Sequence, residues 1–184
     1  MAALLRNPRF LFGAAVLALL VLVALLAPWI APHDPMEQSL LNQLLPPRWM
    51  KGGDPAYLLG TDTLGRDLVS RLVWGARPAL LVMLLGAALS GLVGVVLGLA
   101  AGYFGGALDA AISRVVETFM SFPPMLLAIV LAAVMGPGLA TVVVAVVVIG
   151  WTRFCRVVRG EVLVLRELEF VTSARALGTP HWRI

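Results

Sequence analysis

Residues 79–104 read ALLVMLLGAALSGLVGVVLGLAAGYF and contain no charged side chain. A helix needs about 20 apolar residues to cross the hydrocarbon core of a bilayer, so this run is long enough to span it. Small side chains recur in it at every fourth position, namely at Gly86, Ser90, Gly94, Gly98 and Gly102. This spacing lines one face of a helix and lets a second backbone approach closely. We therefore expect a spanning helix with a small-residue seam that packs against a helix of this chain or of another.

The composition of the chain agrees with this prediction. Its 184 residues are 60% hydrophobic and 13% charged. Soluble domains are about 45–50% apolar and about 25% charged. We expect an all-α integral membrane protein in which the net charge of +4 reflects membrane topology. Lipid is then a partner and nucleic acid is not.

Three further runs are candidate spans. The first, residues 10–31, follows a short N-terminus at 1–9 and ends in Pro-Trp-Ile-Ala, without the small-residue cleavage site of a signal peptide. Its length also exceeds that of a signal peptide, so we expect a retained helix. The other two are residues 119–135, which Pro123 and Pro124 should kink, and residues 139–158. Residues 79–160 would form the transmembrane core, with a short polar link at 105–117.

The most polar part of the chain before its tail is residues 32–78, rich in proline and turn-forming residues. We expect it to be an extracytoplasmic loop with a short amphipathic helix over 63–74. An N-terminus in the cytoplasm places excess positive charge on the inner segments and leaves this loop electrically neutral. The positive-inside rule therefore favours a cytoplasmic N-terminus.

The tail, residues 161–184, is more polar than the spans. Apolar residues in 161–177 follow a helical period, and Gly178 suits the left-handed position after a helix end. Pro180 could open a second helix. We expect a cytoplasmic helix-turn-helix. A helix lying on the membrane surface is the alternative, but the mixed charges favour docking to a protein.

Several chemistries lack the residues they require. The single cysteine, Cys155, cannot form an internal disulfide, and no metal-ligand spacing exists. His33 and His181 fall on opposite sides of the membrane in this topology. The only lysine, Lys51, is not part of a phosphate-binding G-x-x-x-x-G-K-[ST] loop. We expect no catalytic residue, no metal and no cofactor bound by this chain, so that any ATP hydrolysis belongs to another chain.

Two segments carry a resemblance to a known family. Residues 58–77, LLGTDTLGRDLVSRLVWGAR, are similar to the outer-loop block of C-type permease subunits of the dipeptide/oligopeptide/nickel importers. The matching positions are Gly60, Thr61, Asp62, Gly65, Arg66, Asp67, Ser70, Arg71, Gly75 and Arg77. Residues 170–184, FVTSARALGTPHWRI, resemble the EAA-type cytoplasmic loop of ABC importer permeases. Thr172 and Ser173 depart from its first two positions, whereas Ala174 and Gly178 fit.

The resemblance implies a permease of the type I importer fold in the bacterial inner membrane, with four of an expected six spans. It implies a second permease subunit, two ATP-binding subunits that hold ATP and Mg, and an external substrate-binding protein. Coupling to an ATP-binding subunit would fall on Glu169, Thr172, Ser173, Ala174, Arg175 and Gly178. We expect Asp62, Arg66 and Asp67 to shape the outer loop through turns and caps. Peptides or related small solutes would be the cargo, whose identity the motifs do not specify. The chain would stop within the EAA-type loop.

Other function classes are an ATP-independent carrier or channel, a membrane enzyme and a scaffold without transport. A carrier predicts a buried charge or an inverted repeat, and an enzyme predicts a convergent catalytic cluster. We find neither in the sequence. A scaffold differs from the permease only in having no ATP-binding partner.

Overall fold

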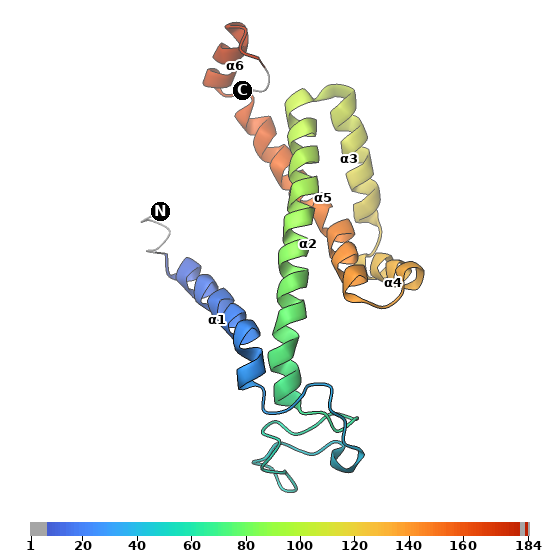
Figure 1. Cartoon of the computed structure of the whole chain (residues 1–184). Helices are drawn as coiled ribbons and strands as arrows, with labels where there is room; N and C mark the ends of the chain where they lie inside the picture. Colours follow the sequence, from blue (N-terminus) through green and yellow to red (C-terminus); the bar gives the residue numbers. More distant parts are fainter. Residues whose placement is uncertain (1–6, 181–182, 184) are drawn as a thin grey trace. The chain divides into compact units, whose positions relative to one another are not determined.

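The computed structural model describes residues 7–180 and 183, and their regular structure is helical apart from a single isolated bridge between Thr61 and Asp67 (Figure 1). The helices are α1 (Pro8–Ile30), a 3-10 turn η1 (Leu40–Asn42), α2 (Leu68–Phe104), α3 (Gly106–Ser121), α4 (Pro124–Met135), α5 (Leu139–Leu165) and α6 (Glu169–Ala176). The predicted all-α class is confirmed. The chain divides into two compact units, residues 1–81 and 82–184, which are described separately.

Three helices, α1, α2 and α5, are long and apolar enough to cross a membrane. The pair α3 and α4 would make a fourth span, broken by a bend of 87°. The break lies at Phe122 and Pro123, which are extended, and α4 begins at Pro124. The predicted proline break in residues 119–135 is therefore present, but it divides two helices instead of kinking one.

The first unit holds α1, the outer loop and the start of α2. Asn7 caps α1 by accepting a hydrogen bond from the backbone N–H of Arg9 at 3.0 Å, and Pro8 takes the first helical position. Ala24 and Ala27 are the buried residues of this helix. The side chain of Arg77 in α2 donates from Nε to the carbonyl of Ala24 at 2.7 Å. That carbonyl needs an outside donor because Pro28, four residues on, has no N–H.

Three sequence predictions about helix boundaries differ from the structure. No separate helix covers residues 63–74, because α2 runs without a break from Leu68 through Pro78 to Phe104. Residues 105–117 are not a polar link, because α3 begins at Gly106. Only Gly105, with φ +66°, separates α2 from α3. The last span is longer than predicted, since α5 reaches Leu165.

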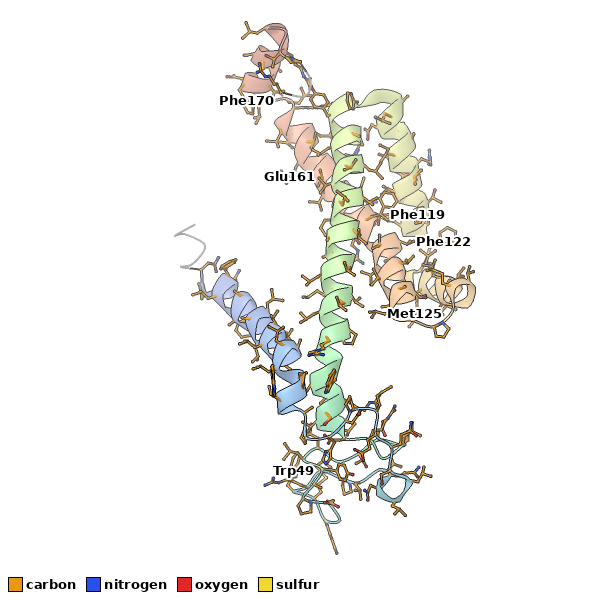
Figure 2. All side chains as sticks on the ribbon, in the orientation of Figure 1. Trp49, Phe119, Phe122, Met125, Glu161 and Phe170 are labelled. Carbon is orange, nitrogen blue, oxygen red and sulfur yellow. The ribbon has the colours of Figure 1, made fainter. Side chains whose placement is uncertain are left out.

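The second unit packs α3 and α4 against α5. Its buried cluster consists of Val116, Trp151 and Cys155. Phe119 of α3 meets Trp151 of α5 edge to face, with ring centroids 5.6 Å apart, and Figure 2 labels Phe119 on its helix. An edge-to-face pair of this kind adds to the burial of both rings and fixes the level at which α3 meets α5.

Candidate functional site

The outer loop is built around Thr61 and Asp62. The Thr61 hydroxyl donates to the carbonyl of Asn42 and accepts from the N–H of Leu45 at 2.9 Å. Asp62 Oδ1 accepts from the N–H groups of Leu64 at 2.8 Å and Arg66 at 3.0 Å. Its Oδ2 binds the guanidinium groups of Arg66, at 2.8 Å, and of Arg71. One threonine and one aspartate thus hold a turn to the loop segment beside it and to the first turn of α2.

These contacts also set the protonation of Asp62. Burial raises the pKa of its carboxyl, but the N–H groups of Arg66 and Leu64 and the Arg66 side chain outweigh burial. They lower the pKa from 3.8 to about 2. Asp62 is therefore a carboxylate at any physiological pH.

Gly60 and Gly65 are required in this loop by backbone geometry. Their φ angles are +80° and +72°, which side-chain-bearing residues rarely adopt. A Cβ atom on Gly60 would collide with the carbonyl of Leu45, and one on Gly65 with that of Ser39. The predicted outer-loop motif thus has a conformational role at its glycines.

Asp67 caps the start of α2. Its Oδ2 accepts from the N–H of Ser70 at 2.9 Å and from the Ser70 hydroxyl at 2.6 Å, while Oδ1 accepts from the N–H of Val69 at 3.4 Å. Ser70 and Asp67 are buried, with exposed fractions of 0% and 2%. Although burial raises the pKa of Asp67, these donors lower it overall. The side chain is an N-cap of the usual kind.

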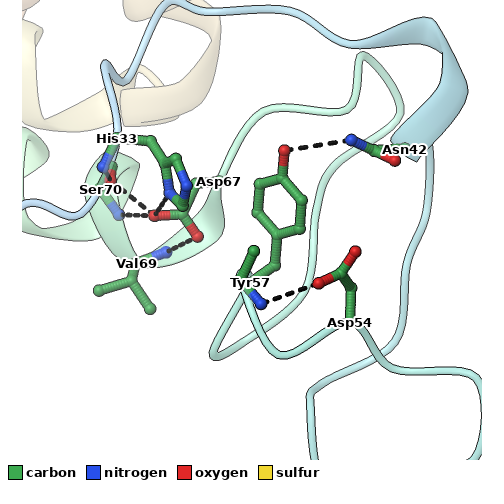
Figure 3. Close-up of polar contacts among 8 residues, drawn as sticks. His33, Asn42, Asp54, Tyr57, Asp67, Val69 and Ser70 are labelled. Carbon is green, nitrogen blue, oxygen red and sulfur yellow. Dashed lines mark hydrogen bonds and ion pairs between the residues drawn. The ribbon is translucent and has the colours of Figure 1, made fainter.

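His33 closes this cluster from the segment that follows α1 (Figure 3). Its backbone N–H donates to Ser70 Oγ at 3.0 Å, and its Nδ1 lies 3.5 Å from Asp67 Oδ2. The ring stacks on Tyr57 with centroids 5.0 Å apart. Ser70, His33 and Asp67 do not form a nucleophilic triad, because the serine hydroxyl donates to the carboxylate and not to the imidazole.

The small-residue seam of α2 lies against α5. A Cβ atom on Gly98 would come within 2.7 Å of the Cys155 carbonyl, and one on Gly102 within 2.7 Å of the Val162 Cβ. Gly86 faces Val146 and Gly94 faces Phe154 in the same way. Ser90 is 2% exposed, with Oγ 3.4 Å from the Val146 carbonyl. The partner helix that the sequence left open thus belongs to this chain.

An ion pair joins α3 to α5 near the end of the seam. Arg159 Nε and Nη2 donate to the two oxygens of Asp109 at 2.5 and 2.7 Å. Ser113, one helical turn after Asp109, donates to the same carboxylate at 3.2 Å. The bidentate geometry fixes both the distance and the rotation of the two helices. The sequence did not predict this pair, because Asp109 was expected in a polar link between spans and not on a helix.

The C-terminal segment turns sharply after α5. The N–H groups of Arg166, Glu167 and Leu168 bond to carbonyls of the last turn of α5 before α6 begins at Glu169. At the other end, Gly178 N–H bonds to the Arg175 carbonyl and Thr179 N–H to that of Ala174, with φ +77° at Gly178. This pair of bonds is the Schellman motif that ends a helix at glycine. The predicted second helix after Pro180 lies largely outside the described residues.

The predicted coupling residues divide between two sides of α6. Val171 is buried at 6% exposure, and the Arg175 guanidinium lies over the Tyr103 ring of α2 at 5.1 Å. Glu169 and Ser173 are exposed on the opposite side of the helix. Thr172 is also exposed, and its hydroxyl donates to the Glu169 carbonyl at 3.0 Å. Arg166, which the sequence did not single out, donates to the Gly102 carbonyl at 2.9 Å.

No group of three or more metal-ligating side chains occurs in the described part of the chain. What the structure offers instead is a set of apolar helices, a compact polar loop and a short capped helix. These features define a multi-span helical membrane protein.

Two family profiles match the chain. Residues 94–184 match the binding-protein-dependent transport system inner membrane component, and residues 1–47 match the N-terminal TM domain of oligopeptide transport permease C. The chain therefore belongs to the C-type permease subunits of the dipeptide/oligopeptide/nickel family, which are multi-pass inner membrane proteins.

Relatives from several bacteria are similar along almost the whole chain. The dipeptide transport system permease protein DppC of Haemophilus influenzae is 38% identical over 173 residues, which are 94% of this chain and 59% of the relative. DppC of Bacillus subtilis is 38% identical over 97% of this chain and 54% of its own length. The nickel transport system permease protein NikC of Escherichia coli is 38% identical over 92% and 59%. The chain thus spans between half and two thirds of the length of these relatives.

Proposed function

We propose that this chain is a permease subunit of an ATP-driven importer for peptides or related small solutes. The observation that carries the proposal is the capped helix α6, which presents an exposed face within the segment matched by the transport-component family. The chain itself would form part of the membrane path. Hydrolysis of ATP with Mg would take place in partner subunits.

The exposed side of α6 is the proposed docking surface for an ATP-binding subunit. Glu169 and Ser173 supply polar contacts, and Phe170 and Leu177 supply apolar ones, with exposed fractions of 66% and 85%. Exposed large apolar side chains on a short helix are typical of a surface that inserts into a groove of another protein. Arg175, a further proposed contact, is exposed on the other side of the helix, where its guanidinium lies over the Tyr103 ring.

The remaining partners follow the same proposal. The N-terminus and α6 lie in the cytoplasm and the outer loop lies outside. A second, different permease subunit completes the membrane path, and two ATP-binding subunits dock on the pair. An extracytoplasmic binding protein delivers the cargo close to the outer loop. Leu41 and Trp49 of that loop, 96% and 65% exposed, give it apolar contact area outside its polar centre.

Two other functions remain as outcomes of the test. An ATP-independent carrier would need no partner at α6, and a scaffold would bind an ATP-binding subunit without transport. The test is co-purification of an ATP-binding subunit with the chain in its native complex, together with uptake that depends on ATP. Absence of an ATP-binding partner would overturn the proposal, and binding without uptake would favour the scaffold.

The turn after α6 provides a sharp variant for this test. Gly178 has open space around it but a φ of +77°, so valine there is strained by its backbone alone. Gly178→Val should weaken co-purification or abolish ATP-dependent uptake. Gly178→Asn, which tolerates the left-handed region, should retain most of both. Gly160→Val is the matched control, because Gly160 lies in α5 with open space around it and no positive φ.

A further inference from the structure

The end of α2 has carbonyl groups that its own helix cannot satisfy. The last carbonyls of any helix lack an intrahelical donor and carry the negative end of the helix dipole. Gly102 is in the last turn of α2, and its carbonyl accepts a hydrogen bond from Arg166 Nη1 at 2.9 Å. Arg166 belongs to the turn between α5 and α6. A cation from the tail thus caps the end of α2.

A second contact joins the same two parts of the chain. The Arg175 guanidinium stacks over the ring of Tyr103, the residue next to Gly102, at 5.1 Å from its centroid. Arg166 lies before α6 and Arg175 in its last turn. The two arginines therefore hold both ends of α6 to adjacent residues of α2. A guanidinium suits both contacts, since it donates in a plane and stacks on aromatic rings.

We propose that Arg166 and Arg175 are positioning residues that tie α6 to α2, so that movement of α6 reaches α2 as well as α5. The inference rests on the proposed function, because it assumes that an ATP-binding subunit moves α6. Through the backbone alone, α6 is joined only to α5. The Asp109–Arg159 pair already ties α5 to α3. With the two arginines, displacement of one short helix is passed to three helices.

The contact matters because α2 connects the outer loop to the residues that the two arginines hold. The helix is continuous from the Asp67 cap in the outer loop to Gly102. A contact at Gly102 therefore acts on the same helix whose first residue follows the outer loop, where we propose that the binding protein docks.

The experiment uses the intact importer in proteoliposomes and measures the rate of ATP hydrolysis. The rate is compared with and without added binding protein, which carries the solute that it retains on purification. Arg166→Ala should leave the ATP-binding subunit bound and basal hydrolysis intact, while stimulation by the binding protein is lost. Loss of a charge-assisted hydrogen bond shifts the equilibrium between α6 in contact with α2 and α6 separated from it by about tenfold or more. Arg166→Lys, which keeps the charge and a donor, should restore most of the stimulation. Arg175→Ala should lower it in part.

Arg114→Ala is the matched control, since Arg114 is an 83% exposed arginine of α3 in the same unit. It should behave as the unchanged importer does. Normal stimulation in the Arg166→Ala, Arg175→Ala double variant would overturn the tie while leaving the proposed function intact. Equal loss of basal and stimulated hydrolysis in Arg166→Ala, without rescue by lysine, would also overturn it, because that pattern belongs to a merely structural residue. If the importer without substitutions purifies without any ATP-binding subunit, that result would instead contradict the proposed function.

Discussion

Asp62 shows how one side chain can order a loop that has little apolar core. Its two oxygens bind backbone N–H groups of its own turn and guanidinium groups from the turn and from α2. The structure uses Asp62, Arg66 and Asp67 to form a turn and a helix cap, which is the role that the sequence led us to expect for them. A residue pattern that is specific for a family can thus be explained by local folding, without contact to a ligand.

The lowered pKa of Asp62 predicts how the outer loop responds to acid. A carboxyl whose pKa is lower in the folded loop stabilises it fully above the unfolded value near 3.8. This stabilisation is lost as the pH falls through the folded value of about 2. We expect the loop to resist pepsin at pH 4 and to be cut readily near pH 2. Asp62→Asn should be cut at both values, and equal cutting of the two chains at pH 4 would contradict this role.

The cap at Asp67 predicts a difference between two substitutions. Asparagine can accept the same backbone N–H groups, whereas alanine leaves them and the Ser70 hydroxyl without their acceptor. Asp67→Ala should therefore destabilise the start of α2 by about 1–2 kcal/mol, and Asp67→Asn by less. Hydrogen exchange at the first turns of α2 measures this. Equal exchange in the two variants would show that the charge of Asp67, and not its capping, is what matters, because both variants lose the charge.

Among the elements, α2 and α5 are joined because small residues on one meet backbone on the other. Gly98 and Gly91 offer a matched pair in α2. A Cβ on Gly98 would lie 2.7 Å from the Cys155 carbonyl, whereas one on Gly91 would lie 4.0 Å from a ring carbon of Phe154. Both alanine variants gain the same helix propensity, about 1 kcal/mol. The difference between them therefore isolates the seam.

We expect Gly98→Ala to be less stable than Gly91→Ala by about 1–3 kcal/mol, the usual cost of overpacking a close contact. Thermal unfolding of the detergent-solubilised protein, followed by circular dichroism, measures the difference. Equal melting temperatures would mean that the two backbones can separate at no cost, and the seam would then be incidental.

The contact between α1 and α2 depends on a proline. Pro28 frees the Ala24 carbonyl, and Arg77 supplies the donor. Arg77→Ala should destabilise the protein by about 1–3 kcal/mol, since a carbonyl in a membrane helix is left without a partner. Pro28→Ala restores an N–H to the helix, so it should suppress part of that loss. A double-mutant cycle on the melting free energies measures the coupling, and strict additivity would contradict it.

At the scale of the whole molecule, apolar runs predicted the presence of α1, α2 and α5, because a membrane span needs such a run, but α2 and α5 extend beyond the predicted spans. The sequence failed where polar residues sit on helices. Residues 105–117 looked like a polar link, yet Asp109 and Ser113 lie one turn apart on α3, and Asp109 pairs with Arg159 of α5. The charges of Arg71 and Arg77 made the start of α2 look like part of the polar loop, because the sequence does not show that Arg71 pairs with Asp62 and Arg77 with the distant Ala24 carbonyl. The spacing of Asp109 and Ser113 was a usable signal, whereas the arginine partners required the structure.

Membrane orientation is the property of the whole chain on which docking at α6 depends. In the proposed topology, Lys51 lies outside and Ser173 inside. The native Cys155 is 1% exposed, so a Cys155→Ser background removes little contact area and leaves no thiol of its own. In intact cells a membrane-impermeant maleimide should label Lys51→Cys at once and Ser173→Cys only after permeabilisation. Positive charge in the tail retains it on the cytoplasmic side and is the physical reason for this expectation. Labelling of Ser173→Cys from outside would leave α6 where no ATP-binding subunit could reach it.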